Sequence, residues 1–226
     1  MNILELAKRN QQKAWEIIED TRIVRIWEGI GAKVNLVGSL RTGLLMKHRD
    51  IDFHIYTSPL DLSASFRALS LIHISEPTRL RRIDFHIYTS PLDLSASFRA
   101  MAELAENTSV KKIEYTNLLH TAEACIEWHA WYQDMEGELW QMDMIHIQEG
   151  SRYDGYFERV AERISAVLTD EMRLAILKLK YETPDTEKIM GVEYYQAVIQ
   201  DGVRSYPEFE EWRRLHPAVG VVEWMP

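Results

Sequence analysis

The sequence predicts an α+β fold: a mixed β-sheet flanked by helices, with a helical C-terminal third. Three observations predict it. Helical and strand-like patterns alternate along the first 150 residues. The segment Asp50–Tyr56 alternates between apolar and polar residues, as a half-buried strand does. Beyond Ser151, apolar residues recur every three or four positions, which is the spacing of one helix face.

The N-terminal part predicts two helices, a strand, a helix-compatible turn and a second strand, over residues 2–20, 21–30, 33–37, 40–46 and 50–56. In the second strand, alternation sends the apolar side chains to one face and the polar ones to the other. The apolar set is Ile51, Phe53 and Ile55, and the polar set is Asp50, Asp52, His54 and Tyr56.

Three further strands are expected over residues 111–115, 125–132 and 139–147. The C-terminal helices are expected to start at capping residues: Ser151–Asp154 in the form of a capping box, Thr169, Thr183-Pro184, and Ser205 with Glu208. We therefore divide the chain into residues 1–150, which hold the sheet, and residues 151–226, a helical region packed on it.

One segment of the chain occurs twice. Ile51–Ala68 recurs letter for letter as Ile83–Ala100, and Leu69–Arg79 between the copies matches the translation of a transposase-type sequencing adapter. Repeats in natural solenoids differ in sequence and occur several times. We interpret residues 69–100 as an artefactual insert, with a genuine tandem duplication as the alternative. Without it, one helix runs from Leu60 through Phe66 and on into Met101–Glu106.

The strand at Asp50 has two candidate sources, because both copies contain it. The second copy has Arg82 where the first has Asp50, and it is not preceded by Gly38-Ser39. We expect the first copy to enter the sheet, since its short connection from Gly38 has the lower loop-closure cost.

Composition restricts the class of protein. Hydrophobic residues make up 46% of the chain, enough for a packed core, and the formal net charge is −9. An acidic chain does not favour a nucleic-acid partner, since phosphate neutralisation needs a basic face. The single cysteine, Cys125, fits a small core residue and a reducing compartment. We find no signal peptide and no apolar run of membrane-spanning length, so we expect a cytoplasmic protein.

The most informative residues lie between 34 and 56. Gly38-Ser39 closes a strand and opens a helical turn, where glycine allows close approach of the backbone and the free N–H groups and the Ser39 hydroxyl favour a phosphate. Asp50 and Asp52 follow on one face of the next strand. Two neighbouring carboxylates repel unless a cation lies between them, and hard oxygen ligands suit Mg²⁺ that also binds substrate phosphates.

A Gly-Ser pair, about ten residues, and then Asp-x-Asp on the next strand resembles the signature of the DNA polymerase β-like nucleotidyltransferase superfamily. The family has a third carboxylate on a later strand, and Asp143 stands in that place in ELWQMDMIHI. The resemblance covers residues 33–56 and 139–147. It implies that Gly38 and Ser39 hold the phosphates of a nucleoside triphosphate, that Asp50, Asp52 and Asp143 bind Mg²⁺, and that Asp143 orients or deprotonates the attacking hydroxyl.

Arg41 and Lys47 flank the expected phosphate site and are further candidates for nucleotide binding, with an ordinary surface position as the alternative. Lys178, Lys180 and Tyr181 fit a solvated helix end better than a triphosphate contact. For Trp128, Trp131 and Trp140 we favour strand packing over a base-stacking platform.

The resemblance implies a Mg²⁺-dependent nucleotidyltransferase. Such an enzyme transfers a nucleoside monophosphate from a nucleoside triphosphate, with ATP the expected one, to a hydroxyl of a small molecule or protein, and it releases pyrophosphate. The alternative is a non-catalytic nucleotide-binding regulatory or antitoxin-like module on the same fold. The presence of all three carboxylates argues against that alternative.

Overall fold

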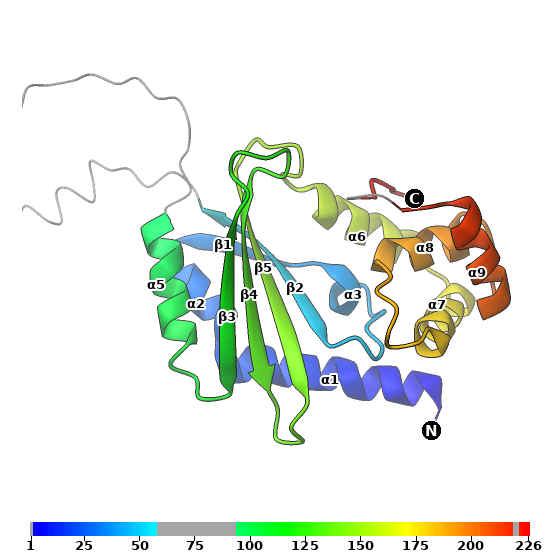
Figure 1. Cartoon of the computed structure of the whole chain (residues 1–226), viewed down its shortest axis with the longest axis horizontal. Coiled ribbons are helices and arrows are strands. Elements are labelled where there is room, and N and C mark those ends of the chain that lie inside the picture. The colour runs from blue at the N-terminus through cyan, green and yellow to red at the C-terminus, as the bar shows by residue number, and fades with distance from the viewer. Residues whose placement is uncertain (1, 58–93, 219–221) are drawn as a thin grey trace, which may run out of the picture.

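The computed structural model describes residues 2–57, 94–218 and 222–226. A five-stranded sheet has helices on both of its faces (Figure 1). The strands are β1 (Ala32–Leu36), β2 (Asp50–Thr57), β3 (Val110–Asn117), β4 (Cys125–Gln133) and β5 (Leu139–Ile147). The helices are α1 (Ile3–Thr21), α2 (Ile23–Gly29), α3 (Gly38–Arg41), α5 (Leu94–Leu104), α6 (Tyr156–Val167), α7 (Asp170–Glu182), α8 (Gly191–Ile199) and α9 (Tyr206–Leu215).

The sheet is mixed, as predicted. Its strand order is β1-β2-β5-β4-β3, with β2 and β5 parallel and every other neighbouring pair antiparallel. All five predicted strands are present, and only their ends shift by one or two residues. The parallel pair brings residues from distant parts of the chain side by side.

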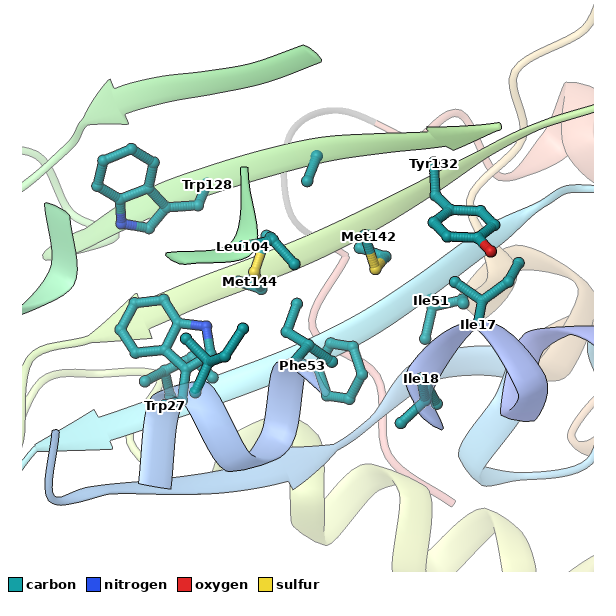
Figure 2. Close-up of a cluster of buried hydrophobic side chains, with 14 of the residues drawn as sticks. Ile17, Ile18, Trp27, Ile51, Phe53, Leu104, Trp128, Tyr132, Met142 and Met144 are labelled. Carbon is teal, nitrogen blue, oxygen red and sulfur yellow. The ribbon is translucent and has the colours of Figure 1, made fainter. Parts of the chain in front are cut away.

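The main core lies between the sheet and helices α1, α2 and α5 (Figure 2). The predicted alternation in β2 is confirmed, since Ile51, Phe53 and Ile55 are each 1% exposed or less. Trp128 and Trp140 also pack in this core, as predicted. Trp131, the third tryptophan of that set, is half-buried on the opposite face of β4. It packs there against the neighbouring strand β3, where Lys112 Nζ lies 4.4 Å from its ring centroid.

The C-terminal helices form a second hydrophobic cluster. Its buried members include Ile164, Ile176, Leu179, Tyr194, Val198 and Phe209, and Leu44 joins them from the segment after α3. The buried residues of the first cluster all precede position 150, and those of the second follow it, apart from Leu44. The division into residues 1–150 and 151–226 stays a prediction. No helix in the described ranges is long and apolar enough to cross a membrane.

Two of the predicted helix starts are confirmed and two are wrong. Thr169 caps α7 by accepting the Met172 N–H, and the Glu208 carboxylate accepts the Ser205 N–H at the start of α9. Helix α6 begins instead after Gly155, whose φ of +64° glycine tolerates, and not with a capping box at Ser151. Thr183 ends α7: its hydroxyl donates to the carbonyl oxygen of the preceding turn, and α8 begins only at Gly191.

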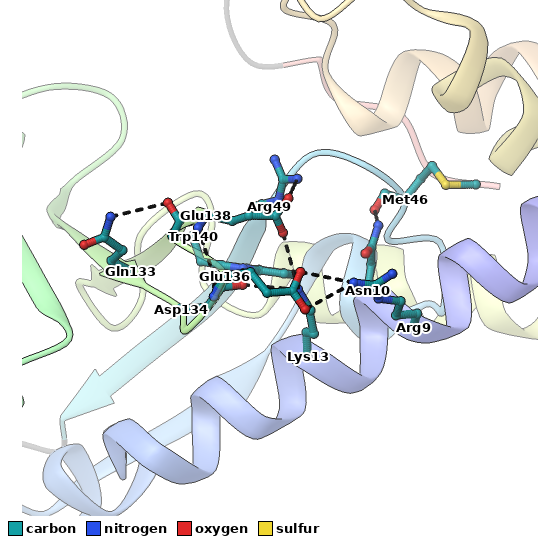
Figure 3. Close-up of polar contacts among 11 residues, drawn as sticks. Arg9, Asn10, Lys13, Met46, Arg49, Gln133, Asp134, Glu136, Glu138 and Trp140 are labelled. Carbon is teal, nitrogen blue, oxygen red and sulfur yellow. Dashed lines mark hydrogen bonds and ion pairs between the residues drawn. The ribbon is translucent and has the colours of Figure 1, made fainter. Parts of the chain in front are cut away.

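A charged network fixes α1 against the β4–β5 hairpin and the start of β2 (Figure 3). Lys13 Nζ lies 2.6 Å from Glu136, 3.3 Å from Asp134 and 3.4 Å from Glu138. Glu138 also pairs with Arg49, the residue before the first carboxylate of β2. Ion pairs with an exposed member, such as Glu136, are each worth about 0–1 kcal/mol. The network therefore serves to set the relative position of these elements more than to stabilise the fold.

Glu158 connects α6 to the sheet. Its Oε1 accepts hydrogen bonds from Tyr56 Oη (2.8 Å) and Asn35 Nδ2 (3.1 Å), and His54 Nδ1 lies 3.3 Å away. Burial opposes ionisation of this carboxyl, but the interactions with His54, Asn35 and Tyr56 outweigh it and lower the pKa of Glu158 to about 2. The ionised carboxylate is thus part of what holds α6 beside β1 and β2.

The duplicated segment contributes to the fold from both copies. The first copy supplies β2, which confirms the prediction that it enters the sheet. The second supplies residues 94–100 of α5, where Ala96, Ser97 and Ala100 are buried and Trp128 Nε1 donates to Ser97 Oγ at 2.7 Å. The expected helix residues 60–66 and most of the insert lie outside the described residues. The interpretation of 69–100 as an artefact stays a prediction.

Deleting residues 69–100 is expected to preserve the fold. Leu62–Ala68 would then replace the identical Leu94–Ala100 in α5, and four residues would join β2 to it in place of 36. Because each halving of a loop lowers its closure cost by about 0.6 kcal/mol, the free energy of unfolding should rise by up to about 2 kcal/mol. Urea unfolding of both chains measures this. A deleted chain that does not fold would contradict the equivalence of the copies.

The pH dependence of stability should contain a contribution from Glu158. A carboxyl with a lowered pKa stabilises the folded state above its unfolded value of 4.5, and that stability is lost as pH falls toward about 2. Glu158→Gln should therefore lower the free energy of unfolding by about 3 kcal/mol at pH 7. It should also make the free energy of unfolding depend less on pH between 4.5 and 2. Glu162→Gln, an exposed change on the same helix, is the control. Identical pH curves for the two variants would show that the lowered pKa does not support α6.

Candidate active site

A cavity of about 880 Å³ lies between the free face of the sheet and the C-terminal helices. Its sheet side is polar and includes Gly38, Ser39, Asp50, Asp52 and Asp143. Its helical side is largely apolar and is lined by Phe157, Val160, Ile164, Ile189, Tyr194 and Trp224, among others. The volume is within the usual range for small-molecule sites. All three predicted metal ligands and the predicted Gly-Ser pair therefore line one cavity.

The pairing of β2 with β5 brings the carboxylates together. In the parallel register Asp52 is opposite Asp143, and Asp50 is opposite Gln141. Residues that face each other across neighbouring strands point to the same side of the sheet. Two segments that are 91 positions apart in the chain thus supply one group of acidic side chains.

Gly38 lies directly against one of these carboxylates. Its φ is +66°, and a Cβ placed on it would be 2.0 Å from Asp52 Oδ2 and 2.7 Å from Asp52 Cγ. Both the left-handed conformation and the lack of space exclude a side chain. The turn at Gly38 is therefore packed against Asp52, and the close approach to a bound phosphate expected from the sequence stays a prediction.

Ser39 offers two polar groups at this point. Its backbone N–H donates a hydrogen bond to the Asp52 carboxylate. Its side chain is 7% exposed, and among the described residues its Oγ has no hydrogen-bond partner. A buried hydroxyl without a partner costs free energy that a bound ligand would recover.

The pKa of Asp52 depends on its burial and on the charges around it. Burial, together with the charges of Asp50 and Asp143, raises the pKa of Asp52 well above its usual range. The ammonium of Lys180 and the Ser39 N–H act in the opposite direction. Mutual repulsion among the three carboxylates is what a bound cation would relieve.

Lys180 lines the cavity and is buried, so the solvated helix end expected for it is wrong. It is 6% exposed, and its Nζ donates to the Leu44 carbonyl at 3.1 Å and to Tyr195 Oη at 3.2 Å. Its neighbours on the helix, Lys178 and Tyr181, are exposed, as predicted for the whole group. The helical pattern around Lys180 is weakly amphipathic, so only packing of α7 against α8 and the segment after α3 decides which lysine is buried.

Asp143 is held by two donors. Its Oδ1 lies 2.5 Å from His129 Nδ1 and accepts from Gln141 Nε2 at 2.7 Å, and Glu127 lies 3.6 Å from the other ring nitrogen of His129. Hydrogen bonds to Asp143 and then to Glu127 raise the pKa of His129 to about 10. Its contact with Asp143 depends on the β4–β5 register and so was not predictable from local sequence.

Arg41 and Lys47 do not line the cavity. Arg41 is exposed at the end of α3, and Lys47 Nζ pairs with Asp185 Oδ1 at 2.8 Å and with the Thr183 carbonyl. The positively charged residues that do line the cavity are Lys180, Arg49 and Lys188. The nucleotide-binding role expected for Arg41 and Lys47 stays a prediction.

The donor set fits a divalent metal, although its ligands are not pre-arranged. Among the described residues, no three His, Cys, Asp or Glu side chains already form a complete metal site. The chemistry of the set nevertheless matches Mg²⁺, since three carboxylates and a free serine hydroxyl are hard oxygen ligands. Cys125, the single cysteine, is buried in β4, as predicted.

Comparison with known proteins gives no sequence relative and a clear structural likeness. No family model and no curated protein match the chain. A Cid1 poly(U) polymerase with bound MgGTP has a TM-score of 0.50 at 12% identity, over 84% of this chain and 49% of that one. A GLD-2/RNP-8 complex also has a TM-score of 0.50, at 8% identity, over 96% of this chain and 67% of that one.

A third similar structure is the poly(A) polymerase complex of GLD-2 with GLD-3, with a TM-score of 0.48, 9% identity and coverage of 88% of this chain and 58% of that one. The chain spans about half the length of the Cid1 enzyme. The two likenesses at a TM-score of 0.50 show that the chain has the nucleotidyltransferase fold, which confirms the predicted fold class.

Replacing Gly38 tests the geometry of the turn. Gly38→Ala should lower the free energy of unfolding by about 2 kcal/mol or more, because the new methyl group collides with the Asp52 carboxylate and the backbone requires a positive φ. Gly29→Ala is a matched control, since nothing lies within 4 Å of a Cβ at that position. Urea unfolding compares the variants. Equal effects of the two substitutions would contradict the close approach of Gly38 to Asp52.

Proposed function

We propose that this protein is a Mg²⁺-dependent nucleotidyltransferase that transfers a nucleoside monophosphate from a nucleoside triphosphate to an acceptor hydroxyl. The observation that carries the proposal is the position of Asp50, Asp52 and Asp143 in one cavity beside the Gly38–Ser39 turn. The nucleotidyltransferase fold supports it.

Gly38 and Ser39 are proposed to bind the terminal phosphates. The absence of a side chain at Gly38 lets the turn pack against the Asp52 carboxylate, and Ser39 Oγ supplies a donor that is otherwise without a partner in the described structure. Lys180 adds a positive charge from the opposite wall, and its position is fixed by Leu44 and Tyr195. These groups are proposed to bind and orient the triphosphate, and they do not discriminate among bases.

Asp50, Asp52 and Asp143 would hold Mg²⁺, which when bound neutralises the charge that develops on the reacting phosphate. The acceptor oxygen forms a bond to the α-phosphorus, the bond to the bridging oxygen breaks, and pyrophosphate leaves. Asp143 is proposed to orient the acceptor hydroxyl and to receive its proton.

The strand order separates the two reactants. The Gly38–Ser39 turn follows β1 on one side of β2, whereas Asp143 lies on β5 at the other side. In-line displacement requires the nucleophile and the leaving group to lie on opposite sides of the phosphorus. The acceptor should therefore approach over β5 and β4, where the sheet face carries His129 and Trp131.

The acceptor class has two candidates. The charge of −9 favours a small molecule or a protein. One of the similar structures is a poly(U) polymerase, which favours the end of an RNA strand. The expectation that nucleic acid is not a partner thus has no support from the comparisons. ATP remains the expected nucleotide.

Thermal unfolding with each nucleoside triphosphate, with and without Mg²⁺, tests the proposal. A triphosphate at a hundred times its dissociation constant should stabilise the chain by about 2.7 kcal/mol when Mg²⁺ is present, and the Asp50→Asn/Asp52→Asn variant should lose this shift. Pyrophosphate release by that variant should fall by at least about 100-fold. Asp170→Asn, an exposed change at the start of α7, is the control for folding.

The outcomes separate the alternatives. A Mg²⁺-dependent shift without pyrophosphate release for any acceptor would favour the non-catalytic nucleotide-binding module. No shift with any triphosphate would overturn the proposed function. With a labelled nucleoside triphosphate, transfer of the label to an RNA oligonucleotide, to a protein or to a small hydroxyl compound would identify the acceptor class.

A further inference from the structure

The C-terminal segment carries a tryptophan into the wall of the cavity. Residues 222–226 run beside α6 (Figure 1). Three contacts fasten the segment there: Arg152 pairs with Glu223 at 2.6 Å, Arg163 Nη1 donates to the Pro226 carbonyl at 3.4 Å, and Tyr156 Oη donates to the Trp224 carbonyl at 3.5 Å. The segment is thus attached on both sides of Trp224.

The indole of Trp224 is held by a hydrogen bond at its edge and by packing against the hydrophobic cluster of the C-terminal helices. Its Nε1 donates to Gln200 Oε1 at 2.6 Å, and the side chain is half-buried and lines the cavity. A hydrogen bond at the edge of an aromatic ring fixes the orientation of the ring, and this ring forms part of the cavity wall.

The two sides of the cavity match the two ends of one kind of ligand. The polar groups come from the sheet, whereas the side formed by α6, the start of α8 and Trp224 is mainly apolar. A nucleoside triphosphate carries charge at one end and a planar apolar ring at the other. With the phosphates beside Ser39, the ring would face the helical side.

We propose that Trp224 stacks on the base of the bound nucleotide and thereby supplies binding energy that is independent of the phosphates. This inference rests on the proposed function. Because every base has a π face, stacking of this kind does not discriminate strongly among the four bases.

Binding of non-hydrolysable nucleotide analogues with Mg²⁺, measured by calorimetry on the full chain, tests the inference, with inorganic tripolyphosphate as the probe that lacks a base. Trp224→Leu keeps an apolar side chain on the helices but removes the ring. It should weaken all four nucleotide analogues by roughly 5- to 150-fold. Its affinity for tripolyphosphate should stay within about twofold of the wild-type value, since no phosphate contact is changed.

Two controls separate stacking from general damage. Trp224→Phe restores a ring and should recover most of the nucleotide affinity. Trp15→Ala removes a tryptophan that is 50% exposed on α1 and should change neither ligand's affinity. Equal losses for nucleotide and tripolyphosphate in Trp224→Leu would overturn the inference, as would an unchanged nucleotide affinity. A wild-type chain that binds neither ligand would overturn the proposed function as well, so the two failures are distinguishable.

Discussion

The parallel pairing of β2 with β5 is the interaction on which the rest of this structure depends. Its register places Asp52 opposite Asp143 on the free face, and Ile51 and Phe53 in the core on the other. A slip of one residue would exchange the two faces of a strand. The apolar side chains packed under α1, α2 and α5 therefore determine the register, and the register determines which carboxylates meet. Stability and the candidate chemistry come from opposite faces of the same strands.

The carboxylates of Asp50, Asp52 and Asp143 lie close together on the free face of the sheet, and groups from several other elements offset their charge. Lys180 on α7 offsets the charge at Asp52, and His129 on β4 holds Asp143. Buried charges that lack partners are costly, whereas paired ones are tolerated. In the proposed active state Mg²⁺ would take part of this role. Asp143 would then have to share its carboxylate between the metal and the donors that now hold it.

The two copies of the duplicated segment contribute different elements to the fold. The first copy forms β2 and the second forms the start of α5. A short connection to β1 favours the first copy for the strand, because loop closure costs less. Continuity with Met101 favours the second copy for the helix. The second copy could not reproduce the candidate site, since Arg82 stands in place of Asp50.

The sequence by itself determined the periodic elements and the chemistry of the motif. All five strands, the buried alternation of Ile51, Phe53 and Ile55, and the common face of Asp50 and Asp52 follow from local pattern, because the side-chain period of a strand is two residues. The glycine at position 38 also answers a local requirement, since its backbone has a positive φ that side chains rarely adopt. These features need no knowledge of distant segments.

Only the tertiary structure decided which other residues complete the site. Lys180 is buried in the cavity because α7 packs against α8, while Arg41 and Lys47, which the sequence favoured, lie elsewhere. The contact of His129 with Asp143 requires the β4–β5 register, and Trp224 reaches the cavity through contacts with α6 and Gln200. Such contacts join residues far apart in the chain, so no local pattern predicts them. Packing and register select one partner among several of the same chemical type.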